Sequence, residues 1–247
     1  MKFIKEILAR VFAVWGIIWF VITMLIFFIP FFLFCYFKKD PQRNSRFILM
    51  AREWMRVYLT IIGCPLTVKG KENFKKGETY IVICNHNSFM DIPISSPSIP
   101  GGNKTIAKIE LAKVPLFGVL YKTGSVLVDR KSDASRKESY VKMKETLNMG
   151  LHMCIYPEGT RNVSDKPLNN FHDGAFKLAV NSGKAIIPAL IFHTRGILPS
   201  NKSFYFWPHS MQIHFLPPIE PVPGETHAQL KEKAFNTMTA YYSANNH

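Results

Sequence analysis

An uninterrupted apolar run lies near the N-terminus and extends from Val11 to Phe37 without a charged residue. It exceeds the roughly 20 residues that a helix needs to cross the hydrocarbon core of a bilayer. It is also too long for the apolar region of a signal peptide, and no small-residue cleavage pattern follows it. We therefore expect a membrane segment that the protein retains, with Pro30 bending or breaking the helix near its end.

Basic residues on both sides of this run leave its placement open. A single span favours an asymmetry between its flanks, and the larger downstream excess of Lys and Arg places the rest of the chain on the cytoplasmic face of the membrane. The alternative is a segment whose two ends touch the same anionic leaflet. The basic residues are Lys2, Lys5 and Arg10 before the run and Lys38, Lys39, Arg43 and Arg46 after it.

The next stretch, residues 46–63, has the pattern of an amphipathic helix. An amphipathic, basic helix after an apolar one is typical of an interfacial anchor, with Arg52 and Arg56 as interfacial cations. The alternative is a helix packed on the core of the following domain. We predict a two-helix membrane anchor over residues 1–63 and an α/β domain over 64–247. The apolar positions of the pattern are Phe47, Met50, Trp54, Val57, Tyr58 and Ile61, at steps of three and four residues.

The remainder alternates short β-branched runs with helical patterns. Such alternation predicts an α/β fold, here a mixed sheet flanked by helices. Ser135 with Glu138 suggests a capping box at the start of one helix, and Gly150 its end. Strands are expected within residues 66–70, 79–84, 104–108, 124–129, 151–157, 185–192 and 211–216, and helices within 132–150, 173–183 and 227–242.

Polar side chains gather where these strands end, which is where α/β sheets place their ligand sites. His86 and Asp91 follow one strand, and Asp91 lies where a helix can begin. If that helix turns back on the loop, Asp91 can fix the imidazole tautomer and leave the other nitrogen free to take a proton. An ordinary hydrogen-bonded loop pair is the alternative.

No GxSxG nucleophile motif occurs in the sequence, and Ser88 lacks its glycine frame. A His–Asp pair without a protein nucleophile indicates that the substrate supplies the hydroxyl. The predicted reaction is direct transfer to an alcohol, with His86 as general base.

Cations at the other strand ends indicate what that alcohol carries. Lys108, Arg130 and Arg161 each follow a strand, and guanidinium and ammonium groups bind phosphate. Gly159 and Thr160 add backbone and hydroxyl donors beside Arg161. An acceptor with both a hydroxyl and a phosphate fits, and the membrane segment implies that it is a lipid.

Overall composition agrees with an anionic, lipidic partner. The formal net charge is +14, and 13% of the residues are aromatic. The aromatic residues concentrate in the N-terminal segment rather than interleaving with a basic patch, which argues against a nucleic-acid binder. The four cysteines stand singly and show no metal-ligand spacing with the histidines, so we expect no metal.

Four sequence blocks now stand in order: Asn85-His86-x4-Asp91, Gly124–Arg130, Tyr156–Arg161 and Ile187–Leu190. They resemble the four blocks of the glycerolipid acyltransferases, the 1-acylglycerol-3-phosphate acyltransferase (PlsC-like) family. The segment Ala107–Gly118 also looks like the one between the family's first two blocks. The resemblance covers roughly residues 66–220.

This resemblance implies an acyl thioester donor, either acyl-CoA or acyl carrier protein, and lysophosphatidic acid as acceptor. It implies His86 as the base and Asp91 as its partner. It assigns Glu158, Gly159 and Arg161, with Arg130 and Lys108, to the site for the acceptor phosphate. No cofactor is expected. Tyr156 stands where the family usually has Phe, and this keeps the apolar character of the position.

The sequence leaves three alternatives to this activity. One is a family member that acts on glycerol 3-phosphate or another lysolipid. Another is a membrane-bound lipid hydrolase that uses the same pair on water. A third is a non-catalytic, basic lipid-binding protein, against which the intact His86, Asp91, Glu158 and Arg161 argue.

Overall fold

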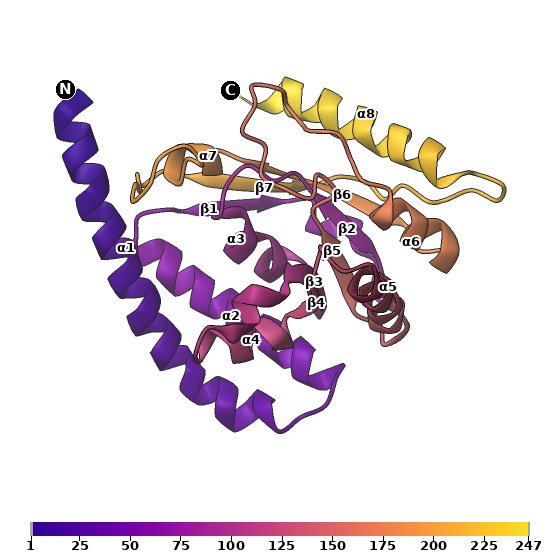
Figure 1. The fold of residues 1–247 in the computed structure, drawn as a ribbon, viewed down its shortest axis with the longest axis horizontal. Coiled ribbons are helices and arrows are strands. Elements are labelled where there is room, and N and C mark those ends of the chain that lie inside the picture. The colour runs from indigo at the N-terminus through magenta and orange to yellow at the C-terminus, as the bar shows by residue number, and fades with distance from the viewer. Residues whose placement is uncertain (1, 247) are drawn as a thin grey trace.

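The computed structural model describes residues 2–246 and shows a sheet between two layers of helices (Figure 1). Its seven strands lie in the order β1-β7-β6-β2-β5-β3-β4. The predicted mixed sheet flanked by helices is therefore confirmed, and each expected strand is present. Their bounds are β1 Leu66–Lys69, β2 Ile81–Cys84, β3 Asn103–Lys108, β4 Ser125–Val128, β5 His152–Ile155, β6 Ile186–Phe192 and β7 Met211–Phe215.

Strand direction decides where the site forms. The strands β6, β2, β5, β3 and β4 are mutually parallel, whereas β7 runs antiparallel to β6 and β1 runs parallel to β7. The carboxyl ends of five strands therefore meet at one edge of the sheet, the edge at which open α/β sheets bind ligands.

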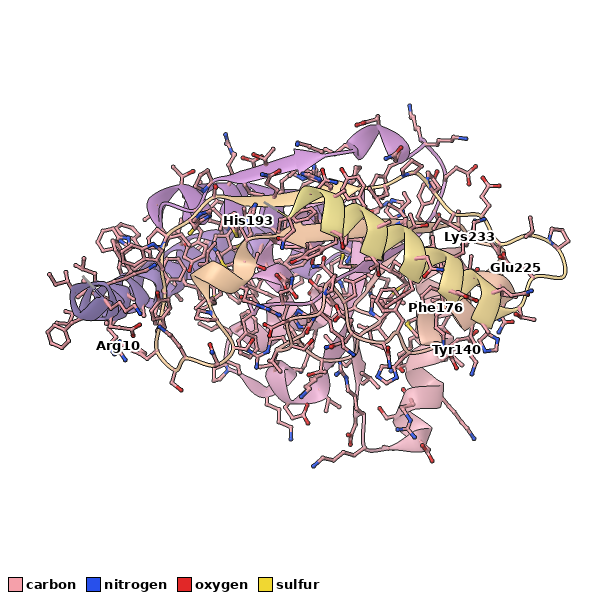
Figure 2. All side chains as sticks on the ribbon, turned by 90° about the horizontal axis from the view of Figure 1, so that it is seen from above. Arg10, Tyr140, Phe176, His193, Glu225 and Lys233 are labelled. Atoms are coloured by element: carbon pink, nitrogen blue, oxygen red, sulfur yellow. The ribbon has the colours of Figure 1, made fainter. Side chains whose placement is uncertain are left out.

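The central strands β2 and β6 are buried on both faces. Alternate side chains belong to two different cores because successive residues of a strand point to opposite faces. One core packs under α1–α4 and the other under α5, α6 and α8. Figure 2 shows α8 lying over the sheet. The helices are α1 Lys2–Phe31, α2 Gln42–Ile61, α3 Asp91–Ser98, α4 Phe117–Thr123, α5 Asp133–Asn148, α6 Gly174–Ser182, α7 Thr194–Ile197 and α8 His227–Asn245, with short turns η1 Phe32–Tyr36, η2 Lys71–Asn73 and η3 Ile109–Lys113.

Helix α1 has a side that no other element covers. The segment Lys2–Tyr36 is long and apolar enough to cross a membrane, and only 11% of its most apolar window is buried. Large apolar side chains such as Ile18 and Ile26 are about half exposed. The α-helix ends one residue after Pro30, and the chain continues as the π-helical turn η1. A single helix of this kind is consistent with a membrane segment.

Helix α2 differs from the second anchor helix that the sequence suggested. It lies between α1 and the sheet, and Trp54 and Tyr58 of the predicted apolar stripe are buried in the core. Arg52 was predicted as an interfacial cation, but it donates to the carbonyls of Pro97 and Ile99 at the end of α3. The structure therefore supports one apolar helix, and α2 is the helix packed on the domain. The domain boundary at residues 63/64 stays a prediction.

The start of α5 also differs from the prediction. The N-cap is Ser132, whose hydroxyl accepts from the Ser135 amide, and no Ser135–Glu138 capping box forms. Gly150 follows the end of the helix with a φ of 78°, a left-handed conformation that glycine adopts without strain. A complete capping box instead joins Thr226 and Gln229 at the start of α8.

Candidate active site

The His86 loop joins the end of β2 to the start of α3. Asp91 is the first residue of α3, so its carboxylate turns back toward the loop. His86 Nδ1 lies 2.8 Å from Asp91 Oδ2. The predicted contact between the two side chains is thus confirmed. The catalytic roles assigned to them remain a proposal.

Asp91 is fully buried, and its carboxylate accepts hydrogen bonds from four groups. Oδ2 accepts from the amides of Asn87 at 2.6 Å and Ser88 at 2.8 Å, besides His86 Nδ1. Oδ1 accepts from the Thr194 hydroxyl at 2.5 Å. A carboxylate with this many donors is a fixed acceptor, so we assign the imidazole proton to Nδ1. The other nitrogen, Nε2, is then free to accept a proton.

The backbone of His86 is fixed by the segment that follows β5. Its amide donates to Glu158 Oε1 at 2.7 Å, and its carbonyl accepts from the Asn162 amide at 2.6 Å. Glu158 Oε2 accepts from the amide of Asn169. Burial raises the pKa of Glu158, and the two amide hydrogen bonds oppose that rise. Glu158 therefore holds the His86 loop from behind and does not line the cavity in front of it. Its assignment to the site for the acceptor phosphate stays a prediction.

Two further groups orient this loop. The buried side-chain amide of Asn85 exchanges two hydrogen bonds with the backbone of Ile191 in β6. The ring of Tyr156 lies 4.4 Å from the His86 ring, centroid to centroid, and its hydroxyl pairs with that of Ser95. Burial raises the pKa of Tyr156 well above its usual value, so it is a neutral wall of the site.

The predicted cations line a common cavity of about 240 Å³ in front of His86. Arg130 donates to the Gly159 carbonyl, and the Arg161 guanidinium lies 3.8 Å from the centroid of the Phe89 ring. Of the predicted site residues, Asp91 and Glu158 lie behind this cavity. It is lined by His86, Lys108, Arg130, Gly159, Thr160 and Arg161, together with apolar residues of β3, η3 and α4.

A second, apolar cavity of about 400 Å³ adjoins the basic one. It lies between α2, α3 and α4, with Trp54, Phe117 and Leu120 in its wall. Burial raises the pKa of Tyr121 to about 12, so the phenol between the two cavities is neutral. The cavities share Phe89, Ile92, Thr105, Leu111 and Tyr121. Basic and apolar compartments thus meet beside His86.

The sequence did not predict the roles of Thr194 and Asn162, or the hydrogen bonds by which Asn85 orients the loop. Thr194 does follow a predicted strand, but it lies 103 positions from its partner Asp91. Within residues 2–246, no group of three or more His, Cys, Asp or Glu side chains could hold a metal ion. The expectation that no metal or cofactor takes part stays a prediction.

Comparison with known proteins identifies the family. The acyltransferase family model matches residues 65–192, more than half of the chain. A 1-acyl-sn-glycerol-3-phosphate acyltransferase of Borreliella burgdorferi is 30% identical over 173 residues, which cover 70% of this chain and 68% of that protein. The chain belongs to the acyltransferase family.

Other acyltransferases agree. The 1-acyl-sn-glycerol-3-phosphate acyltransferase of Saccharomyces cerevisiae is 32% identical over 69% of this chain and 57% of its own length. The crystal structure of the 1-acyl-sn-glycerophosphate (LPA) acyltransferase PlsC from Thermotoga maritima has the same fold, with a TM-score of 0.79 at 23% identity over 99% of this chain and 97% of that one.

The matched regions do not extend over whole relatives. The alignments span 68%, 53% and 66% of the relatives from Borreliella burgdorferi, Cocos nucifera and Mycoplasma pneumoniae. Membership of the acyltransferase family therefore rests on the shared domain.

Proposed function

We propose that this acyltransferase moves an acyl chain from an acyl thioester to the sn-2 hydroxyl of 1-acylglycerol 3-phosphate and so forms phosphatidic acid. The observation that carries the proposal is the place of His86. Its Nδ1 is bound to a buried carboxylate, and its ring lines a cavity that contains Lys108, Arg130 and Arg161. A base directed at a cationic cavity suits an alcohol that bears a phosphate. The names of the relatives support this substrate.

The proposed reaction needs no protein nucleophile. His86 Nε2 takes the proton of the sn-2 hydroxyl as its oxygen attacks the thioester carbonyl. The tetrahedral intermediate collapses, the carbon–sulfur bond breaks, and the imidazolium returns the proton to the leaving thiolate. Asp91 stabilises the imidazolium and keeps its tautomer. A general base of this kind typically contributes about 10²–10⁴ in rate.

The two cavities suit different parts of the substrates. The three cations of the basic cavity bind the acceptor phosphate, Arg161 and Arg130 with planar forks and Lys108 as a point charge. The apolar cavity takes the acyl chain of the donor, because it adjoins the cavity that His86 lines and its wall is almost wholly apolar. Acyl-CoA and acyl carrier protein both present such a chain on a thioester.

We further propose that the enzyme works at the cytoplasmic face of a membrane. The uncovered apolar side of α1 supports membrane contact, and the formal net charge of +14 favours an anionic leaflet. Both proposed acyl donors are water-soluble, whereas the acceptor is a lipid. A site at the membrane surface allows both to reach His86.

The test is to incubate the purified protein with an acyl thioester and a mixture of lysolipids, and to identify the products by mass. We expect phosphatidic acid as the main product. Acylation of glycerol 3-phosphate or of a different lysolipid would reassign the acceptor. Release of free fatty acid without an added acceptor would indicate a hydrolase.

A pair of histidine variants tests the role of the base. His86→Ala should abolish transfer while membrane binding persists. His209→Ala provides the matched control, since the His209 side chain is exposed and, among residues 2–246, hydrogen-bonds only with the neighbouring Ser210. Turnover of the His86 variant at the wild-type rate would refute the assignment.

A further inference from the structure

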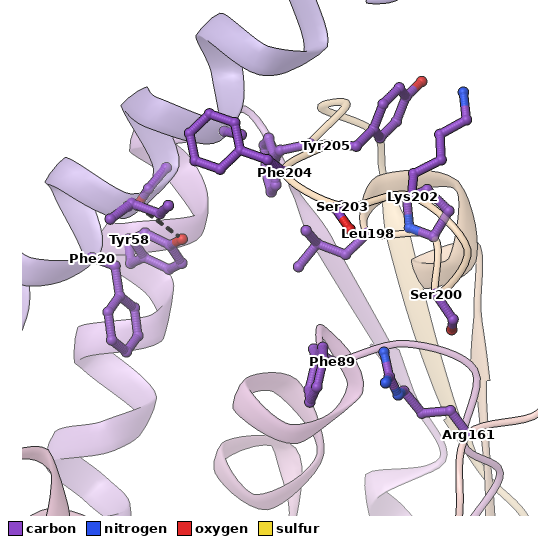
Figure 3. A pocket seen from close by; sticks show the side chains of 15 residues that line it. Phe20, Tyr58, Phe89, Arg161, Leu198, Ser200, Lys202, Ser203, Phe204 and Tyr205 are labelled. Atoms are coloured by element: carbon purple, nitrogen blue, oxygen red, sulfur yellow. Dashed lines mark hydrogen bonds between the residues drawn. The ribbon is translucent and has the colours of Figure 1, made fainter. Parts of the chain in front are cut away.

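A third cavity lies between α1 and the loop that follows α7 (Figure 3). We call it the α1–loop cleft. Its volume of about 550 Å³ is within the range of roughly 300–1,000 Å³ that is usual for ligand pockets. Its main walls are Ala13, Gly16, Ile17 and Phe20 of α1, Tyr58 of α2 and the loop residues 198–200 and 202–206.

The loop is fastened to α1 at several points. The Phe206 amide donates to the Ala9 carbonyl, and Lys202 pairs with Glu6. The ring of Trp207 packs edge-on against that of Phe12 at 5.9 Å. The cleft is therefore a built part of the fold.

The cleft communicates with the catalytic cavity. Arg161 and Phe89 line both of them, and Figure 3 shows these two side chains side by side at the lower end of the cleft. Phe89 also lines the apolar cavity, so all three compartments meet at this residue. Arg161, by contrast, belongs to the basic cavity and the cleft but not to the apolar cavity.

The chemistry of the substrates indicates why it matters that Arg161 lines the cleft but not the apolar cavity. When the sn-2 oxygen attacks, two acyl chains are present, one on the donor and one already on the sn-1 oxygen of the acceptor. The sn-1 chain and the phosphate sit on the same glycerol. A phosphate bound to Arg161 therefore directs the sn-1 chain into a compartment that Arg161 lines. The apolar cavity does not meet that condition, whereas the cleft does.

Access also favours a membrane lipid as the occupant. The wall formed by Ala13, Gly16 and Ile17 is one side of α1, and its outer side exposes Val14, Ile18 and Val21. A lipid that leaves the bilayer along α1 thus passes directly into the cleft. The loop adds Ser200, Lys202 and Ser203, polar groups that suit the ester end of a lipid.

We propose that the α1–loop cleft binds the sn-1 acyl chain of the monoacyl glycerol phosphate acceptor. This assignment rests on the proposed function for the identity of the acceptor. It divides the two chains of the reaction between two cavities, the donor chain between α2 and α4 and the acceptor chain between α1 and the loop.

A blocking variant in the loop tests the proposal. Ser203→Trp fills the cleft, and Asn201→Trp is the matched control, because Asn201 is exposed in the same loop and does not line the cleft. Ser203→Trp should raise KM for an acceptor with a palmitoyl chain by about tenfold or more. This is the loss of affinity expected when roughly two methylene groups are no longer buried. KM for a hexanoyl acceptor should change little. Equal effects on both acceptors, or an effect that follows donor chain length, would overturn the proposal.

A binding measurement separates this proposal from the proposed function. His86→Ala protein in detergent is irradiated with a 1-acylglycerol 3-phosphate that carries a photoreactive group near the end of its chain. We expect label in the peptides around Gly16 and Ser203. Label around Phe117 and Leu120, or none in the cleft, would overturn the assignment. Because this readout needs no turnover, label in the cleft without acyl transfer by the wild-type protein would reject the proposed function alone.

Discussion

The two sides of the candidate site are built differently. On the side of the base, Asp91 and Asn85 are fully buried, and their side chains hydrogen-bond to His86 and to the backbone of Ile191. On the side of the cations, Lys108, Arg130 and Thr160 are exposed at strand ends. The base is thus fixed before substrate arrives, whereas the cations have room to adapt to it.

This difference matches what each side has to do. Proton transfer needs a defined nitrogen at a defined distance, and preorganisation by buried hydrogen bonds supplies it. A phosphate can be attracted by several cations of looser geometry, and water remains in contact with them. Changes on the buried side should therefore act on kcat, and changes on the exposed side on KM for the acceptor.

After the loss of His86 itself, the largest expected effect is that of Asp91→Asn. The neutral amide that replaces the carboxylate removes the negative charge that stabilises the imidazolium, and its oxygen is a weaker acceptor for the Nδ1 proton, so the imidazole is held less firmly in its tautomer and orientation. We expect kcat to fall by about 10³, measured as initial rates at saturating substrates. A loss of less than about tenfold would remove the contrast between the two sides.

Arg161→Ala should have the next largest effect, and it should fall on the acceptor. Loss of a phosphate contact raises KM for lysophosphatidic acid by about tenfold to a hundredfold, with little change in KM for the thioester. Arg161→Lys keeps the charge but not the planar fork, so it should recover only part of the loss. Equal losses with phosphorylated and unphosphorylated acceptors would contradict the phosphate contact.

Thr194→Val tests the buried side more finely. The variant removes one hydrogen bond to Asp91 while the His86 contact remains, and kcat should fall by about tenfold with KM for the acceptor unchanged. Thr146→Val is the control, because that buried hydroxyl donates only within α5. A change in acceptor KM with constant kcat would place Thr194 on the recognition side.

The smallest effect on activity is expected at His152, where a substitution should change stability alone. Burial lowers the pKa of His152 from 6.5 to about 4, while its Nδ1 accepts from the Tyr80 amide. As the pH falls, His152 takes up a proton in the unfolded chain before it does so in the folded protein. Its contribution to the free energy of unfolding is therefore present above pH 6.5 and is lost as the pH falls toward 4.

His152→Gln should therefore make the unfolding temperature fall less steeply below neutral pH. The full pKa difference of His152 corresponds to about 3 kcal/mol in the free energy of unfolding. Gln keeps an acceptor for the Tyr80 amide. The two proteins should be compared by thermal unfolding from neutral pH to about pH 4.5. Parallel curves would show that His152 does not titrate on unfolding.

The sequence predicted the strands and the His86–Asp91 contact because both are local. Strand patterns depend on neighbouring residues, and five positions separate the histidine from its partner. It also predicted that Lys108, Arg130 and Arg161 meet, since the ends of parallel strands share one edge of the sheet.

Partners far apart in the sequence escaped prediction. Thr194 reaches Asp91 only because β6 lies beside β2, and strand order is not encoded in the periodicity of either strand. Glu158 is a residue type that often binds substrate. Only the structure shows that it is buried and accepts a hydrogen bond from a backbone amide. Likewise, the apolar stripe of α2 does not reveal whether it faces lipid or protein.

The pairing of Asn85 with Ile191 has a consequence for the chemistry of position 85. One side-chain amide supplies both the donor and the acceptor of a missing rung of the ladder, just past the last residue of β2. Aspartate has two acceptor oxygens and no donor for the Ile191 carbonyl. Leucine would leave both the N–H and the carbonyl of Ile191 buried without a hydrogen-bond partner. The asparagine one residue before His86 thus links β2 to β6 through its side chain. The backbone groups of β6 fix the orientation of its amide, with the NH2 toward the carbonyl and the oxygen toward the N–H.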